Sequence, residues 1–181
     1  MKREIRKGRN RAKSDVANVL ESLFVAETLS PAKEIWLVSP WISDVKLIDN
    51  RAGRFTHLNA LGERHLKISE IFTYLAQRGT KATVVVSDHD YAQDFRVQFP
   101  RAFGEKNLEN FLNFVIKPNE ELHEKTIATK DWQVGGSMNF TKQGIEVRDE
   151  VVSIETDPKI VSATIIDLRT RFPWAPENSG G

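Results

Sequence analysis

The stretch 123–152 reads HEKTIATKDWQVGGSMNFTKQGIEVRDEVV and decides the fold. It opens with His123 and Lys125, whose spacing on a strand would direct the imidazole and the ammonium to the same side. Ser137 and Asn139 follow with the same spacing, and a pair of acidic residues comes near the end. Apolar or β-branched residues surround all three groups. This pattern predicts polar side chains gathered at the end of a buried sheet.

These residue types are suited to attack on a phosphate. Histidine acts as a nucleophile or a general acid near neutral pH. Lys125, Ser137 and Asn139 can neutralise and hydrogen-bond the oxygens on which negative charge develops. A carboxylate such as Glu150 can fix the tautomer of a neighbouring histidine and raise its basicity. The stretch therefore predicts a site for phosphoryl chemistry.

The spacing resembles the HKD signature of the phospholipase D superfamily. Residues 136–141 (GSMNFT) are similar to the family's GS-x-N-(F/W)-T segment, and residues 149–152 (DEVV) to its N/D-E-V strand. Where the family has its Asp, this chain has Lys130, and Asp131 lies one residue further on. We interpret this departure as a shortened hairpin turn at Lys130-Asp131, since Asp is a common turn residue.

The resemblance implies a phosphodiesterase that needs neither a metal nor another cofactor. In that family one histidine attacks phosphorus and a second protonates the leaving oxygen. One imidazole cannot be neutral to attack and protonated to donate in the same step, so a chain with one motif implies a homodimer. The expected catalytic residues of each copy are His123, Lys125, Ser137, Asn139 and Glu150.

Hydrophobic periodicity places helices and strands alternately along the chain. Helices are expected over residues 14–29, 66–78, 108–114 and 158–172, and strands over 34–39, 81–87, 115–116 and 147–154. A hairpin is expected over 126–129 and 132–135, whereas residues 42–65 match no pattern. This order predicts one α/β domain over 14–174, phospholipase D-like, with a mixed β-sheet sandwiched between helices. The end of the chain, 175–181 (APENSGG), is typical of a disordered tail.

Composition limits the class of protein. Of 181 residues, 40% are hydrophobic and 28% charged, which is typical of a soluble globular domain. Cysteine is absent, which excludes disulfides, thiolate metal sites and a cysteine nucleophile. No stretch approaches the roughly 20 apolar residues of a membrane span, and the start lacks the apolar core of a signal peptide. We therefore expect a cytoplasmic protein that does not contact membranes.

A basic N-terminal arm, residues 1–13, carries seven Lys and Arg against one Glu, although the whole chain has a net charge of only +1. Phosphate contacts supply most non-specific affinity for nucleic acid, so Arg9 and Arg11 are expected substrate-binding residues. The alternative is a frayed terminus that only aids solubility.

By size, the chain looks most like single-motif bacterial nucleases, some of which serve in restriction or phage defence. That likeness implies a DNA or RNA substrate and partner proteins from a defence or DNA-modification system. Gly136, Trp41 and Trp132 are expected to contact the substrate, the two indoles as stacking platforms for bases. One alternative is a nucleic-acid-binding module that has lost turnover, favoured by the displaced Asp131. A lipid phosphodiesterase is the other, disfavoured because no exposed apolar helix would dock to a bilayer.

Overall fold

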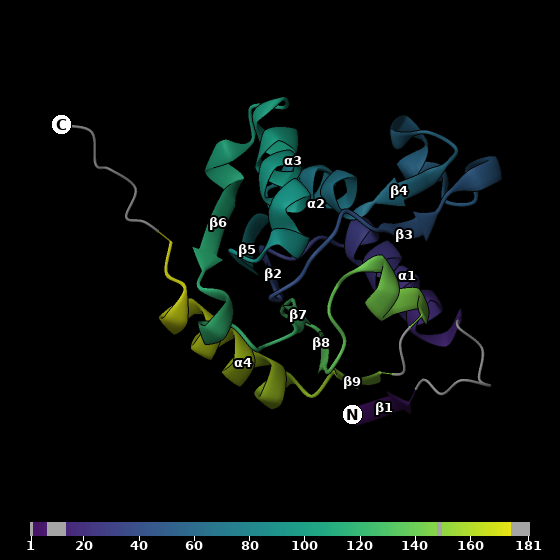
Figure 1. Cartoon of the computed structure of the whole chain (residues 1–181). Coiled ribbons are helices and arrows are strands. Elements are labelled where there is room, and N and C mark those ends of the chain that lie inside the picture. The colour runs from purple at the N-terminus through teal and green to yellow at the C-terminus, as the bar shows by residue number, and fades with distance from the viewer. Residues whose placement is uncertain (1, 7–13, 148–149, 175–181) are drawn as a thin grey trace.

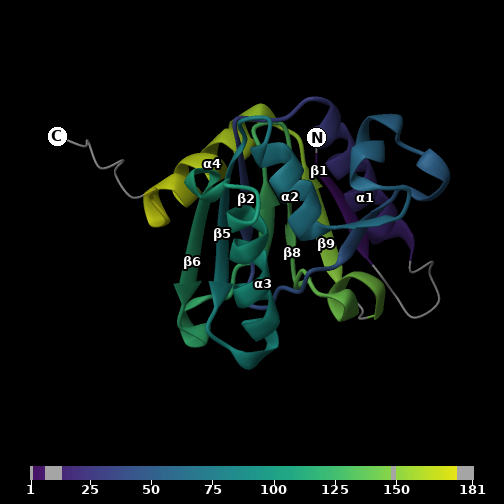
Figure 2. The same ribbon diagram turned by 90° about the horizontal axis from the view of Figure 1, so that it is seen from above.

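A mixed seven-stranded sheet forms the centre of the protein. The computed structural model describes residues 2–6, 14–147 and 150–174. In order across the sheet the strands are β1 (Lys2–Arg6), β9 (Val151–Glu155), β8 (Gln133–Gly136), β7 (Thr126–Ala128), β2 (Glu34–Val38), β5 (Lys81–Ser87) and β6 (Leu112–Lys117). Strands β2, β5 and β6 are parallel, whereas β7, β8, β9 and β1 each run antiparallel to their neighbour. Figure 2 shows the sheet with β6 at one side and β9 and β1 at the other.

Helices cover both faces of this sheet, as expected from the sequence. The helix α4 (Pro158–Arg171) lies along one face, and α2 (Ile68–Ala76) and α3 (Gln93–Gly104) lie on the other (Figure 1). The face of α2 and α3 also receives α1 (Ser14–Leu29), whose Val16, Leu20 and Phe24 are buried in the same cluster. The expected α/β fold with a mixed sheet between helices is therefore confirmed.

Strand β2 shows why its sequence reads as a nearly continuous apolar run. Ile35 and Leu37 are buried in the cluster under α1 and α2, whereas Trp36 and Val38 are buried against α4. A strand covered on both faces has no solvent side to carry polar residues.

Most expected elements are confirmed. The helices over 14–29 and 158–172, the strands over 34–39 and 81–87, and the hairpin with its turn at Lys130-Asp131 are all present. Asp157 caps α4, accepting hydrogen bonds from two backbone N–H groups of the first turn, and Pro158 follows directly. The second helix begins at Ile68 rather than residue 66, and β9 begins at Val151 rather than residue 147, because a π-helical turn (Gln143–Val147) comes before it.

The helix expected over residues 108–114 is wrong. A short 3₁₀ turn (Glu109–Phe111) leads into β6, which pairs in parallel with β5 at the edge of the sheet. In the strand, Phe114 lies against Phe95 and Phe99 of α3, with ring centroids 6.3 and 6.1 Å away. The pairing of β6 with β5 and the packing of Phe114 on α3 therefore favour a strand, although the local spacing of apolar residues predicts a helix.

The unassigned stretch 42–65 forms a small subdomain beside α1. Its two strands, β3 (Lys46–Asp49) and β4 (His65–Lys67), are antiparallel and are joined by 3₁₀ turns (Arg51–Gly53 and Thr56–Leu61). The Glu21 carboxylate of α1 accepts a hydrogen bond from the Asp49 backbone N–H at 2.8 Å, which attaches β3 to the helix.

Part of the basic arm belongs to the sheet. Lys2–Arg6 pairs antiparallel with β9 along its whole length, so this part is not frayed. Arg9, Arg11 and the expected tail 175–181 lie outside the described residues. Over the described part of the chain, no helix has the length and apolar character needed to cross a membrane.

The expectation that Trp132 contacts substrate is wrong. Its side chain is 5% exposed and lies edge-on to Phe24, with ring centroids 5.8 Å apart. The indole N–H donates to Glu27 Oε2 at 3.2 Å, while Glu27 Oε1 accepts from the Ala32 backbone N–H at 2.6 Å. Trp132 therefore belongs to the core, because it precedes β8 at the end of the strand away from Gly136 and packs against α1.

Glu27 makes stability depend on pH. Burial raises the pKa of its carboxyl above the ordinary value of 4.5, although the hydrogen bonds from Ala32 and Trp132 oppose the shift. Because the folded state favours the protonated form, this contribution to stability is fully present below pH 4.5 and is lost as pH rises through the folded-state pKa.

We expect the melting temperature of wild type, relative to Glu27→Gln, to fall as pH rises from 4.5 toward 8. Thermal unfolding of both proteins across that range measures the difference, in which the titration of groups that do not interact with Glu27 cancels. A difference independent of pH would contradict the raised pKa.

Candidate active site

The strand directions bring the ends of four strands to one edge of the sheet. Val38 pairs with Thr126, and Thr126 pairs with Gly135. Gly136 in turn pairs with Val152. We call this the site edge. The term means one end of the strands, where β2 and β8 end and β7 and β9 begin, and not an edge strand of the sheet. Strands β5 and β6 also point toward it (Figure 2). The segments of the HKD-like stretch are therefore neighbours here, as expected from the sequence.

Ser137 and Glu150 form a direct contact across the site edge. The Ser137 hydroxyl donates to Glu150 Oε2 and accepts a hydrogen bond from the Val151 backbone N–H at 3.0 Å. The Ser137 backbone N–H donates to the Val151 carbonyl, also at 3.0 Å. These bonds fasten the end of β8 to the start of β9, so the carboxylate and the hydroxyl have defined positions.

Gly136 permits this close approach of the two strands. Its φ is +145°, and a Cβ there would lie 2.0 Å from the Val151 carbonyl oxygen. No side chain fits at that distance, so the glycine of the motif has a steric role as well as its expected place beside the substrate.

Asn139 lies just beyond, on the other side of Ser137. It is nearly buried, and its Oδ1 lies 3.2 Å from the Ser39 hydroxyl at the end of β2. This contact holds the Asn139 amide beside the end of β2. Gly144 allows the π-helical turn to close over Asn139, since a Cβ at Gly144 would meet the Asn139 carbonyl oxygen at 2.2 Å.

His123 and Lys125 come before β7 rather than within it. The Lys125 ammonium donates to the His123 carbonyl at 2.7 Å, so it turns back along its own segment. The exposed His123 lines a cavity of about 460 Å³ with Lys117 and Arg171. Within the described residues, no hydrogen bond joins its imidazole to Ser137, Asn139 or Glu150. The fold brings all five residues to one edge but places only Ser137 and Glu150 in mutual contact.

Trp41 is half-buried beside this site, and its role as a substrate contact stays a prediction. Its indole N–H donates to Asn119 Oδ1 at 3.3 Å. Asp131, in contrast, lies in the β7–β8 turn at the opposite end of the sheet, where it pairs with Lys130. Among the residues that the structure describes, no group of three or more His, Asp or Glu side chains is placed to hold a metal ion.

Ser39 was not singled out as a site residue by the sequence, although a signal was present. Polar groups at the carboxyl end of a buried strand commonly line sites in α/β proteins, and Ser39 directly follows β2. Its hydroxyl also lies 3.0 Å from the Trp41 carbonyl, so it links the β2 end to the motif.

The fold of the chain is similar to that of solved structures. Nuc from Salmonella typhimurium, a phospholipase D family member, is similar with a TM-score of 0.57 and 13% identity, over 94% of this chain and 93% of that one. The chain has the phospholipase D superfamily fold. NucT from Helicobacter pylori is similar with a TM-score of 0.53 and 15% identity, over 94% and 95% of the two chains.

The same fold relates the chain to TrmBL2, an archaeal chromatin protein with a novel mode of DNA binding. The TM-score is 0.50 with 12% identity, over 94% of this chain and 51% of that one. At such identities the likenesses to phospholipase D-fold structures show the fold alone. No protein-family model and no curated protein matches the sequence.

Proposed function

We propose that the protein is a metal-independent phosphodiesterase that cleaves DNA or RNA in an active site shared by two copies of the chain. One observation supports the proposal: the strand pairing brings the segments that carry His123, Lys125, Ser137, Asn139 and Glu150 to the same end of the sheet. Such a set can attack a phosphodiester and stabilise the charge that develops on it.

In the proposed reaction, His123 of one copy attacks phosphorus and forms a P–N bond as the bond to the leaving oxygen breaks. His123 of the second copy, protonated, gives its proton to that oxygen. A water then attacks the phosphohistidine, its proton passes to the second imidazole, and the P–N bond breaks. Both histidines end in their starting forms, and Lys125 and the Asn139 amide hold the phosphate oxygens throughout.

Glu150 has a positioning role in this scheme. Because its carboxylate accepts the Ser137 hydroxyl hydrogen, it orients Ser137 within its own chain. Ser137 and Asn139, two residues apart, then flank the phosphate on the β8 side.

Nucleic acid is the substrate that the observations favour. TrmBL2 shares the fold and, as a chromatin protein, binds DNA. The chain also has the basic segment 1–13, whose strand part lies beside β9, the strand that follows Glu150. Because this segment carries seven Lys and Arg against one Glu, it favours a polyanionic substrate.

The test is incubation of the purified protein with labelled single- and double-stranded DNA and RNA in EDTA. We expect cleavage that EDTA does not reduce, because Lys125 and the Asn139 amide supply the charge stabilisation that a metal provides elsewhere. Vanadate should inhibit by occupying the phosphate site. Activity that EDTA abolishes and Mg²⁺ restores would contradict this mechanism.

A binding module without turnover is the second candidate. It is favoured by the hydrogen bond of the Lys125 ammonium to its own backbone, which occupies one of its donors. It predicts tight nucleic-acid binding with no cleavage of any of the four substrates, in EDTA or in Mg²⁺.

A further inference from the structure

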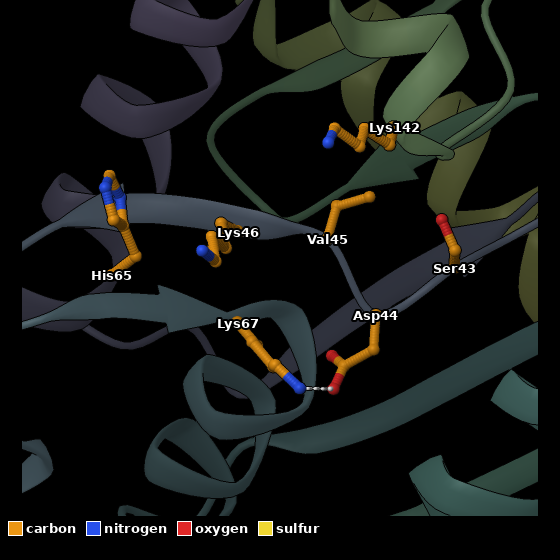
Figure 3. A pocket seen from close by; sticks show the side chains of 7 residues that line it. All are labelled: Ser43, Asp44, Val45, Lys46, His65, Lys67 and Lys142. Carbon is orange, nitrogen blue, oxygen red and sulfur yellow. Dashed lines mark ion pairs between the residues drawn. The ribbon is translucent and has the colours of Figure 1, made fainter.

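Two adjoining pockets lie outside the HKD-like site. The basic pocket, of about 530 Å³, is lined by Ser43, Asp44, Val45, Lys46, His65, Lys67 and Lys142 (Figure 3). The aromatic pocket, of about 180 Å³, is lined by Trp41, Ser43, Tyr91, Thr141, Lys142 and Gln143. Ser43 and Lys142 line both pockets, so the two are neighbours.

The path of these pockets begins at the site edge. The segment after β2 runs beside the motif after β8: Ile42 forms a β-bridge with Phe140, and the Ser43 N–H donates to the Phe140 carbonyl at 3.1 Å. Asn139 directly precedes this contact. The pockets therefore lie beside this contact, and the basic pocket reaches the β3–β4 subdomain.

The basic pocket concentrates positive charge at some cost to the fold. Lys46 and Lys67 are directly opposite on β3 and β4, and like charges at such positions repel. Asp44 offsets part of this, since its Oδ2 lies 3.7 Å from the Lys67 ammonium. The same carboxylate accepts hydrogen bonds from the Ser69 backbone and hydroxyl, both at 2.9 Å.

Lys142 brings a third ammonium to this pocket from the motif side, as Figure 3 shows. With three Lys and one Asp in the lining, the pocket carries a charge of +2 when His65 is neutral. A pocket that keeps unbalanced cations together next to a phosphodiester site is suited to a second phosphate.

The aromatic pocket offers flat rings instead. Tyr91 is 70% exposed and stacks on His89, with centroids 5.4 Å apart and planes 11° apart. Trp41 lies against both rings, with centroids 5.5 Å from Tyr91 and 5.6 Å from His89. An exposed ring held by two others at low cost in side-chain entropy is suited to stack on a nucleobase.

We propose that the two pockets form a binding path for single-stranded nucleic acid, with a base on Tyr91 and Trp41 and the backbone phosphates beside Lys142, Lys46 and Lys67. A base can lie on these rings only when it is unpaired, which excludes a duplex from the same path. This inference rests on the proposed function, to which it adds the strandedness of the substrate.

The first test replaces the three lysines. The variants are made in a His123→Ala background, so that the oligonucleotides are not cleaved. The affinity for labelled oligothymidylate and oligouridylate is measured at several salt concentrations. Lys46→Ser, Lys67→Ser and Lys142→Ser together should weaken binding at least ten-fold. They should also reduce the slope of log affinity against log salt concentration by about 2, since each of the three phosphate contacts contributes roughly 0.7. Serine is well tolerated at Lys67, the residue before α2.

The matched control changes charge equally elsewhere. Lys33, Lys130 and Lys159 are exposed and lie at the opposite end of the sheet, before β2, in the β7–β8 turn and after β9. Their triple replacement by Ser should leave affinity within about two-fold and the salt slope nearly unchanged. Equal losses in the two triple variants would overturn the path.

The second test removes the ring. Tyr91→Ala should weaken binding of both single strands about ten-fold, whereas Tyr91→Phe, which keeps the ring, should bind as its parent does. Duplex DNA should bind equally to all three. An unchanged affinity in Tyr91→Ala, or an equal loss for duplex, would overturn the stacking role.

Failure of this inference is distinguishable from failure of the proposed function. With His123 intact, the variants should hydrolyse bis(p-nitrophenyl) phosphate at the wild-type rate, because that small diester needs only the site edge. If wild type cleaves both it and nucleic acid while the lysine and tyrosine variants bind normally, only the path is wrong. If wild type cleaves neither, the proposed function is wrong, and the binding data still decide the path.

Discussion

Replacement of His123 by Ala is expected to lower turnover roughly 10⁴-fold or more, because it removes both the nucleophile and the general acid of the composite site. Little else should change. His123 is exposed, and truncation of an exposed side chain typically alters the free energy of unfolding by less than about 0.5 kcal/mol.

The measurement is the cleavage rate with saturating substrate, alongside the melting curve. Because His123 lines an open cavity of about 460 Å³, added imidazole has access to the vacated position and should restore part of the activity. Near-normal turnover in His123→Ala with an unchanged melting curve would show that His123 takes no part in the reaction.

Elements with a strong local signal could be predicted from the sequence. Residues 14–29 carry a helical stripe and residues 81–87 a β-branched run, and both are found where expected. The helix α3 shows the limit: Phe95, Phe99 and Phe103 recur at helical spacing, but Pro100 within it reads as a helix breaker. Long-range packing of that Phe stripe stabilises a helix that local propensity does not favour.

The part of the site that could be predicted is the part whose residues lie within the single stretch 123–152. Ser137 and Glu150, thirteen residues apart, do meet at the site edge. The basic and aromatic pockets were not predictable, because their residues come together only through the β3–β4 pairing and the segment beside Phe140. Trp132 was assigned wrongly because it precedes β8 at the end of the strand opposite the site edge, where its indole packs into the core.

The shared active site is the central claim, and a mixing experiment tests it most directly. Wild-type and His123→Ala chains are co-refolded in varying ratios, so that dimers form at random. If each dimer holds one site made from both motifs, a single mutant chain disables the dimer it enters, since only wild-type pairs supply two imidazoles.

Activity at constant total protein should then fall as the square of the wild-type fraction. An equal mixture of wild-type and mutant chains should keep about a quarter of the activity, and a mixture of one wild-type to nine mutant chains should keep about 1%. Independent sites would keep about a half and about 10%. A quadratic curve is the result expected here. A straight line, or a protein that sediments as a monomer and still cleaves, would contradict the shared site.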